Sequence, residues 1–149
     1  LVRLGLMFEE GRGLAPDPAA AAECYRRAAA KDEPEAQYRL ARLVAPADAR
    51  AAFAWRRQAA ERGYAPAQHD LASCYERGDG VIQDYVSAYA WYSIAAVGDD
   101  AARADRDRVA QAMTPEQIAE GQRKAAAIFA AGPPRGPYPV AVAEVVQPR

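Results

Sequence analysis

Apolar side chains recur at helical spacing through the middle of the chain. Leu71 and Tyr75 lie four residues apart, and Ala88, Trp91 and Ala95 follow at intervals of three and four. Positions at these intervals fall on one face of an α-helix. The pattern therefore predicts two amphipathic helices separated by a short turn.

A glycine-containing turn joins these two predicted helices. Gly78 and Gly80 tolerate a positive φ, which other residues rarely adopt. Asp84 stands where its side chain can accept hydrogen bonds from the free N–H groups of the following helix. Earlier in the chain, Asp17 is placed in the same way, with Pro18 at the first helical position. Both sites predict the start of the second helix of a pair.

The chain contains three copies of this pattern. A shift of 67 positions aligns nine of the first 29 residues with identical residues, among them Leu4 with Leu71 and Glu9 with Glu76. A copy between these two matches the later one at an offset of 31 in its first half and of 36 in its second half, so it lacks five residues of the turn. Repeats of this length are typical of stacked helix-turn-helix arrays.

The third copy resembles the Sel1-like branch of the tetratricopeptide-type repeats. The resemblance is carried by Leu71, Ala72, Tyr75, Gly78, Asp79, Gly80, Val81, Asp84, Ala88, Trp91, Tyr92, Ala95, Ala96 and Gly98. The middle copy departs from the pattern, because Ala45, Pro46 and Ala47 stand where the other copies have turn glycines. The resemblance implies an all-α fold, a right-handed α–α superhelix of helix-turn-helix repeats.

The predicted solenoid occupies residues 1–131. Its repeats cover residues 1–33, 34–64 and 65–98, and capping helices follow at 99–131. Thr114 and Gln117 form a capping box at the start of the last helix. A cap presents a polar outer face to solvent. For that face we expect the side chains of Arg103, Asp105, Arg106, Asp107, Glu116, Glu120, Arg123 and Lys124.

The two ends of the chain carry less information. Residues 132–149 begin with several prolines and are predicted to be a disordered tail. As an alternative, Val140–Val146 adds as a strand to the sheet of a partner. The chain begins at Leu1 rather than at a methionine, so a signal peptide or earlier repeats stay open. The compartment, bacterial cytoplasm, periplasm or the outside of the cell, is open with them.

Composition narrows the range of partners and cofactors. Alanine occupies 38 positions, which favours closely packed helices. The formal net charge is -1 and the basic residues are scattered, which argues against nucleic acid as a partner. No run reaches the roughly 18 apolar residues of a membrane-spanning helix. Because His69 is the single histidine and Cys24 and Cys74 are far apart, the sequence predicts no metal site and no cofactor.

Three neighbouring residues, His69, Asp70 and Cys74, suggest catalysis at first sight. Adjacent positions on a helix point about 100° apart, so His69 and Asp70 do not act together as a base and its orienting group. Asp70 and Cys74 share a helix face, but a carboxylate raises the pKa of a nearby thiol. We therefore predict that the protein is not an enzyme. The alternative is a hydrolase that acts on a β-lactam or cell-wall-like substrate through Cys74 or His69.

The predicted function is a protein–protein interaction scaffold or adaptor. Superhelices of this kind bind on the concave surface, which the first helix of each repeat lines. Positions two before, two after and five after the packed leucine are expected to face that groove. The candidate partner-binding residues are Leu6, Glu9, Tyr38, Arg42, His69, Ser73 and Glu76. Tyrosine and arginine at such positions suit a peptide or a protein segment.

The remaining expectations concern assembly and context. We expect a monomer. The resemblance suggests bacterial signalling, envelope or secretion-related assemblies, although one repeat architecture serves many roles. A further alternative is that the chain is the C-terminal fragment of a longer regulatory protein.

Overall fold

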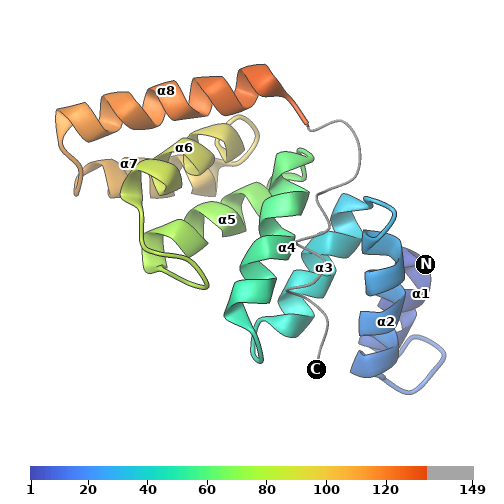
Figure 1. The fold of residues 1–149 in the computed structure, drawn as a ribbon. Helices are drawn as coiled ribbons and strands as arrows, with labels where there is room; N and C mark the ends of the chain where they lie inside the picture. The colour runs from blue at the N-terminus through green and yellow to red at the C-terminus, as the bar shows by residue number, and fades with distance from the viewer. Residues whose placement is uncertain (134–149) are drawn as a thin grey trace.

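The protein is an array of helices. The computed structural model describes residues 1–133, which contain eight α-helices and no strand. They are α1 (Val2–Glu10), α2 (Pro18–Ala29), α3 (Pro34–Val44), α4 (Ala49–Glu61), α5 (Ala65–Arg77), α6 (Tyr85–Ala95), α7 (Asp100–Ala110) and α8 (Pro115–Ala131). The pairs follow one another from α1 and α2 at one end to α7 and α8 at the other (Figure 1). The predicted all-α superhelix is confirmed, and the tail prediction lies, beyond residue 133, outside the described residues.

An aspartate caps the second helix of every repeat. The side chain of Asp17 accepts a hydrogen bond from the Ala20 N–H at 2.9 Å, as predicted. Asp84 accepts one from the Ser87 N–H at 3.1 Å. In the middle repeat, where no cap was predicted, Asp48 accepts one from the Ala51 N–H at 2.9 Å. The shortened repeat therefore starts its second helix in the same way as the other two.

One backbone hydrogen bond closes the turn of each repeat. The N–H of the capping aspartate donates to a carbonyl near the end of the first helix, from Asp17 to Phe8 at 2.9 Å and from Asp84 to Tyr75 at 2.9 Å. Asp48 donates to Val44 at 2.8 Å, although five residues are missing between them. Phe8, Val44 and Tyr75 are equivalent positions of the three copies. The deletion therefore shortens the loop without changing how the two helices are joined.

The contact between repeats is built from leucine and alanine. Leu40 of α3 is buried in one core cluster with Ala28 and Ala29 of the preceding α2. Leu71 of α5 is buried in a second cluster with Ala59 and Ala60 of the preceding α4. Because alanine side chains are small, they let each second helix approach the next first helix closely. The predicted role of alanine in close packing agrees with these clusters.

A glutamine supports the same contact at its edge. The Gln37 amide donates to the Ala29 carbonyl at 3.4 Å, at the end of α2. The Gln68 amide donates to the Ala60 carbonyl at 3.3 Å, at the end of α4. Each carbonyl also accepts a backbone hydrogen bond just after the helix, from the Asp32 N–H to Ala29 at 3.0 Å and from the Gly63 N–H to Ala60 at 2.9 Å. The glutamine therefore adds a second hydrogen bond, which links the end of one repeat to the first helix of the next.

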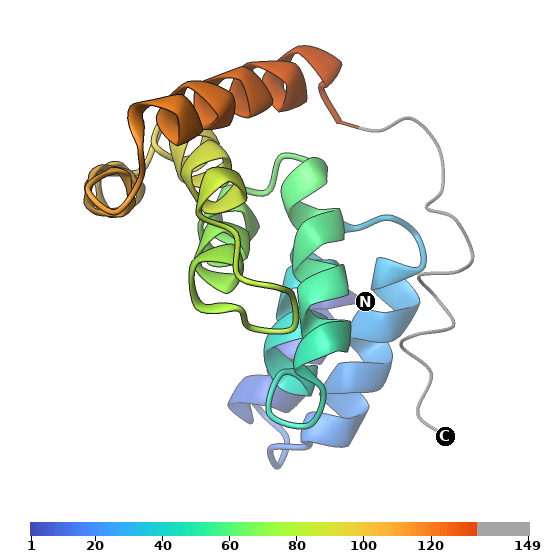
Figure 2. The ribbon, with the colours of Figure 1, turned by 60° about the vertical axis from the view of Figure 1, so that its left-hand side comes forward.

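The capping helices both pack on α6. Helices α7 and α8 both contact α6, and α8 runs across the end of the array (Figure 2). A Cβ built on Gly121 of α8 would lie 2.7 Å from Cδ1 of Tyr89, so glycine is needed where the two helices cross. Lys124 of α8 donates to Ser87 Oγ at 2.6 Å, which fixes the crossing helix to the start of α6. The capping box of Thr114 and Gln117 is present as predicted.

Two equivalent turn glycines differ in their surroundings. Gly13 and Gly80 have φ values of 76° and 72°. A Cβ on Gly80 would overlap the backbone carbonyl of Ala49, whereas a Cβ on Gly13 would meet no atom within 4 Å. The turn of the third repeat therefore packs against the start of α4, and the turn of the first repeat lies open.

Gly80→Ala is expected to destabilise the protein more than Gly13→Ala. Both substitutions place a side chain at a left-handed position, which costs about 1 kcal/mol. Gly80→Ala also forces a methyl group against Ala49, which costs about 1–3 kcal/mol more. Urea unfolding followed by circular dichroism measures the difference. Equal midpoints for the two variants would contradict the close approach of the third turn to α4.

Candidate functional site

The seven predicted groove residues lie on the three first helices. Helix α1 carries two of them, α3 two and α5 three. Arg42 is exposed and the other six are partly buried. They are Leu6 and Glu9 on α1, Tyr38 and Arg42 on α3, and His69, Ser73 and Glu76 on α5. The structure collects six of them into three groups and leaves Leu6 outside these groups.

Glu76 belongs to a group that joins α5, α6 and α7. The Tyr92 hydroxyl of α6 donates to Glu76 Oε2 at 2.7 Å. The Arg108 guanidinium of α7 donates to both carboxylate oxygens of Glu76. Hydrogen bonds from Arg108, and then from Tyr92, lower the pKa of Glu76 although burial opposes this. Burial, and then the bond to Glu76, raises the pKa of Tyr92.

His69 extends this group toward α7. Its Nε2 lies 2.8 Å from Asp105 Oδ2 and its Nδ1 lies 3.4 Å from Asp99 Oδ2. The imidazole ring meets the ring of Tyr92 edge-on, with 5.5 Å between the ring centroids. Ser73 lies close enough to the Tyr92 side chain to lower the pKa of Tyr92, against the larger effects of burial and Glu76. Three predicted residues, His69, Ser73 and Glu76, therefore contact one buried tyrosine.

Asp105 was predicted on the outer face of the cap, and this is wrong. Its carboxylate faces inward, where it contacts His69 and also accepts a hydrogen bond from Arg108 at 3.0 Å. Burial raises the pKa of Asp105, but the hydrogen bonds from His69 and Arg108 outweigh burial, so the pKa is lowered. The alternating charges of α7 thus include a face that holds this helix against α5.

Glu9 forms the same kind of group in the first repeat. The Tyr25 hydroxyl donates to Glu9 Oε2 at 2.6 Å. Nη1 of Arg39, on the first helix of the next repeat, lies 3.7 Å from the same oxygen. Arg39 directly precedes the buried Leu40, just as Arg108 directly precedes the buried Val109. The carboxylate and the tyrosine therefore recur at equivalent positions of two repeats, and in both an arginine of the following helix pair contacts the carboxylate.

At the middle interface, between the second and third repeats, the positions of the positive and negative side chains are exchanged. Arg56 stands at the position of Tyr25 and Tyr92, and Ala45 stands at the position of the glutamates. Nε of Arg56 lies 4.0 Å from Oδ2 of Asp70, the residue that precedes Leu71. The cation is therefore on the second helix and the anion on the following first helix. Each of the three interfaces carries an ion pair, and the middle one is reversed.

Tyr38 and Arg42 form the third group. Their neighbours are Tyr64, which directly precedes α5, and Asp70 of α5. The Tyr38 ring packs against the Tyr64 ring, with 5.3 Å between the centroids. Burial, and then the charge and hydrogen bond of Asp70, raises the pKa of Tyr38, and the charge of Arg42 acts in the opposite direction. An aromatic ring, a carboxylate and an exposed guanidinium thus lie close together at the middle of the array.

The helix pairs match a known repeat. The family model of the Sel1 repeat matches residues 1–33, 34–64 and 65–97. The chain belongs to the Sel1 repeat family. Members of this family are commonly protein-interaction scaffolds. The resemblance stated from the sequence is confirmed.

Two solved structures are similar to this Sel1 repeat chain. One is a protective antigen present in uropathogenic Escherichia coli strains that displays an SLR fold, with a TM-score of 0.73, 24% identity, and coverage of 99% of this chain and 40% of that one. The other is a Sel1 repeat protein from Oxalobacter formigenes, with a TM-score of 0.69, 28% identity, and coverage of 85% and 56%. The Sel1 repeat chain thus spans about half or less of the length of the structures it matches.

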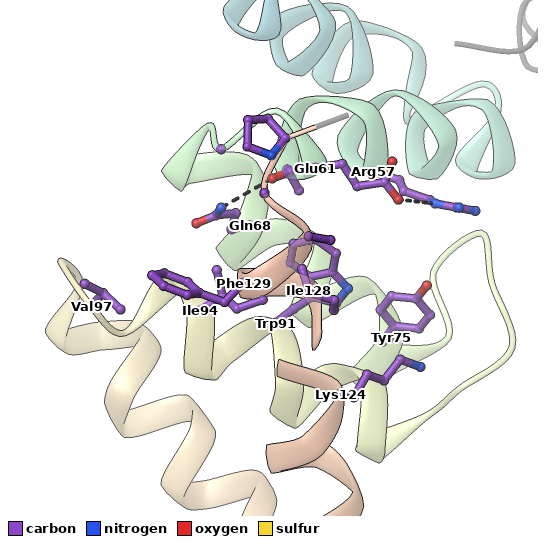
Figure 3. A pocket seen from close by; sticks show the side chains of 15 residues that line it. Arg57, Glu61, Gln68, Tyr75, Trp91, Ile94, Val97, Lys124, Ile128 and Phe129 are labelled. Carbon is purple, nitrogen blue, oxygen red and sulfur yellow. Dashed lines mark hydrogen bonds and ion pairs between the residues drawn. The ribbon is translucent and has the colours of Figure 1, made fainter. Parts of the chain in front are cut away.

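In the second half of the Sel1 repeat array, a groove opens between α4, α5, α6 and α8. It has a volume of about 900 Å³. Trp91, Ile94, Ile128 and Phe129 gather along its middle (Figure 3). On the rim, Arg57, Glu61, Gln68, Tyr75 and Lys124 add polar atoms. Trp91 is buried in the core and also lines this groove, and the partly buried Tyr75 lines it as well.

The catalytic alternative gains no support from this geometry. His69 faces α7 through Asp105, whereas Cys74 faces α4, where Nη1 of Arg56 lies 3.6 Å from its sulfur. Burial raises the pKa of the Cys74 thiol, which disfavours the reactive thiolate. Sel1 repeat folds are usually non-catalytic. Within residues 1–133, no group of three or more His, Cys, Asp and Glu side chains is arranged to hold a metal ion.

None of the helices in the described part of the chain is long and apolar enough to cross a bilayer.

Glu76→Gln is expected to make the stability of the protein depend less on pH in the acid range. Because the folded-state pKa of Glu76 is lowered, its ionised form stabilises the folded state at neutral pH. That contribution is lost as the pH falls from the unfolded value of about 4.3 through the folded one. The variant is expected to cost about 1 kcal/mol at pH 7, since Arg108 is partly exposed, and to flatten the dependence of stability on pH below about 5.

Urea unfolding at a series of pH values between neutral and about 3 measures this effect. Glu120→Gln, at an exposed position of α8, is the matched control and should keep the acid dependence of the unsubstituted protein. An acid dependence equal in both variants would contradict the assignment of Glu76.

Proposed function

We propose that this chain is a non-catalytic scaffold that holds a segment of another protein against the face formed by α1, α3 and α5. The observation that supports this most is the group of Tyr38, Tyr64, Asp70 and Arg42 at the centre of that face. Tyrosine and arginine are the residues that most often dominate the energy of protein interfaces. They lie here on helices, whose backbone does not have to be ordered when a partner binds.

In this proposal the predicted groove residues have two roles. Glu9, His69, Ser73 and Glu76 make internal contacts: with Tyr25 and Tyr92 inside their own repeats, and with Arg39 or α7 across to the next helix pair. Leu6, Tyr38 and Arg42 offer surface to the partner. The rigid face lowers the entropic cost of binding, because the side chains that border the contact are already fixed.

The partner that suits this face is a peptide segment with an acidic and an apolar side chain. Arg42 is exposed and its guanidinium can bind a carboxylate in a bidentate manner. The Tyr38 ring is partly buried and supplies apolar area in the same group, and the partly buried Leu6 of α1 adds apolar area elsewhere on the face. We propose further that the protein acts as a monomer, and that the longer relatives use more repeats to extend the same face.

A double variant of Tyr38 and Arg42 is expected to lose the partner. Tyr38→Ala with Arg42→Ala should weaken capture of a specific protein from the native lysate at least tenfold, since two central contact residues together exceed about 1.4 kcal/mol. Quantitative mass spectrometry of the captured proteins measures the loss. Circular dichroism verifies that the variant is folded.

The control replaces the same two residue types on second helices. Tyr85→Ala with Arg27→Ala removes an exposed tyrosine from α6 and an exposed arginine from α2. This control should capture the same protein as the unsubstituted chain. If the control loses the partner and the Tyr38 and Arg42 variant keeps it, binding takes place on the opposite face. If both keep it, the groove beside α8 is the next surface to test with Phe129→Ala.

A further inference from the structure

The leucine that is buried in two repeats is exposed in the first. Leu40 and Leu71 are 0% exposed, whereas the equivalent Leu4 is 42% exposed. The difference arises because α2 covers Leu40 and α4 covers Leu71, and within the described residues no helix covers Leu4. Leu4 is therefore an apolar contact residue without the contact that its equivalents make.

Neighbouring positions of the first repeat show the same difference. Met7 is 40% exposed, and its equivalent Cys74 is 4% exposed against α4. Leu14 is 46% exposed, and its equivalent Val81 is partly buried. The open space beside Gly13 corresponds to the space that α4 fills beside Gly80. An apolar surface thus lies along the outer side of α1 and its turn, where equivalent surfaces contact a preceding second helix.

The charge at this surface identifies the kind of helix that fits. Arg3 directly precedes Leu4, at the position that Arg39 and Asp70 occupy in the next repeats. Arg39 contacts a glutamate and tyrosine pair of the repeat before it, and Asp70 contacts Arg56. Arg3 is exposed. Arg3 should therefore pair with a carboxylate of the preceding repeat, such as Glu9 or Glu76 of the first and third repeats. A second helix that carries an arginine at the position of Arg56 would repel it.

We infer that the surface formed by Arg3, Leu4, Met7 and Leu14 binds the second helix of a further Sel1 repeat, joined to α1 as α2 is joined to α3. This helix has alanines opposite Leu4. Its repeat carries a glutamate, at the position of Glu9, that pairs with Arg3. At the position of Gln37 and Gln68 the chain has Leu1, so an apolar contact replaces the glutamine bond at the edge. The inference is continuous with the two established repeat contacts and is independent of the proposed peptide-binding face.

The matched test places a further repeat in front of the chain. Residues 1–36 are fused directly before Leu1, so that Leu1 follows Ala36 in place of Gln37 and the added Glu9 and Tyr25 reach Arg3. In the unfused chain Leu4→Gln should lower Tm by less than about 3 °C, because Leu4 is exposed. In the fusion the same substitution should lower Tm by about 8 °C or more, because Leu4 becomes buried.

The charge control uses the other repeat type. Residues 34–67 are fused before Leu1 in the same register, which places the added Arg56 beside Arg3. This fusion should be less stable than the matched one, and Arg3→Asp should reverse the order. Hydrogen exchange of the α1 amides gives a second measurement that needs no substitution, since docking should slow exchange in the matched fusion.

Three outcomes would overturn the inference. The first is an equal Tm loss from Leu4→Gln in the unfused and matched chains. The second is unchanged exchange of the α1 amides in the matched fusion. The third is an unfused chain that is a dimer by light scattering and becomes a monomer with Leu4→Gln, because a second copy would then occupy this surface. None of these results depends on whether Tyr38 and Arg42 bind a peptide.

Discussion

The contact between one leucine and the alanines of the preceding helix is the interaction on which the array depends. The leucine and the alanines that it contacts belong to two consecutive helix pairs. A helix pair on its own therefore leaves Leu40 or Leu71 exposed. Burying a leucine contributes about 1.5–3 kcal/mol. Stability is therefore shared between neighbours and does not belong to single repeats. The small alanine side chains also set the spacing at which the polar residues at the rim can meet.

The ion pairs at these interfaces have a different role from the leucines. They lie at the edge of the contact and are partly exposed, so each contributes about 1 kcal/mol or less. Their geometry is directional, because a carboxylate such as Glu76 receives bonds from a tyrosine and an arginine at once. The apolar contact holds adjacent repeats together, and the polar contact fixes their relative orientation. A face made of several helices keeps its shape only when both are present.

Local features of this fold could be predicted from the sequence and long-range ones could not. The caps at Asp17, Asp84 and Thr114 depend on residues within one turn of each other, and the sequence shows them directly. The bonds from Arg108 to Glu76 and the crossing of α8 at Gly121 join residues about thirty positions apart, and no pattern within one helix shows such a contact. One signal was available, since Glu9 and Tyr25 recur together as Glu76 and Tyr92. Their pairing shows that candidate binding residues can be committed to internal contacts.

The reversed polarity of the middle interface determines the order in which the repeats can stack. If the third repeat docked on the first, Asp70 would approach Glu9, and two carboxylates would repel each other. The correct neighbours present opposite charges at both places. Nearly identical units are prone to pair wrongly during folding and to exchange between molecules. Arg56, Ala45 and Asp70 together thus distinguish the middle pairing from the other two, so that each repeat favours its own neighbour within the chain.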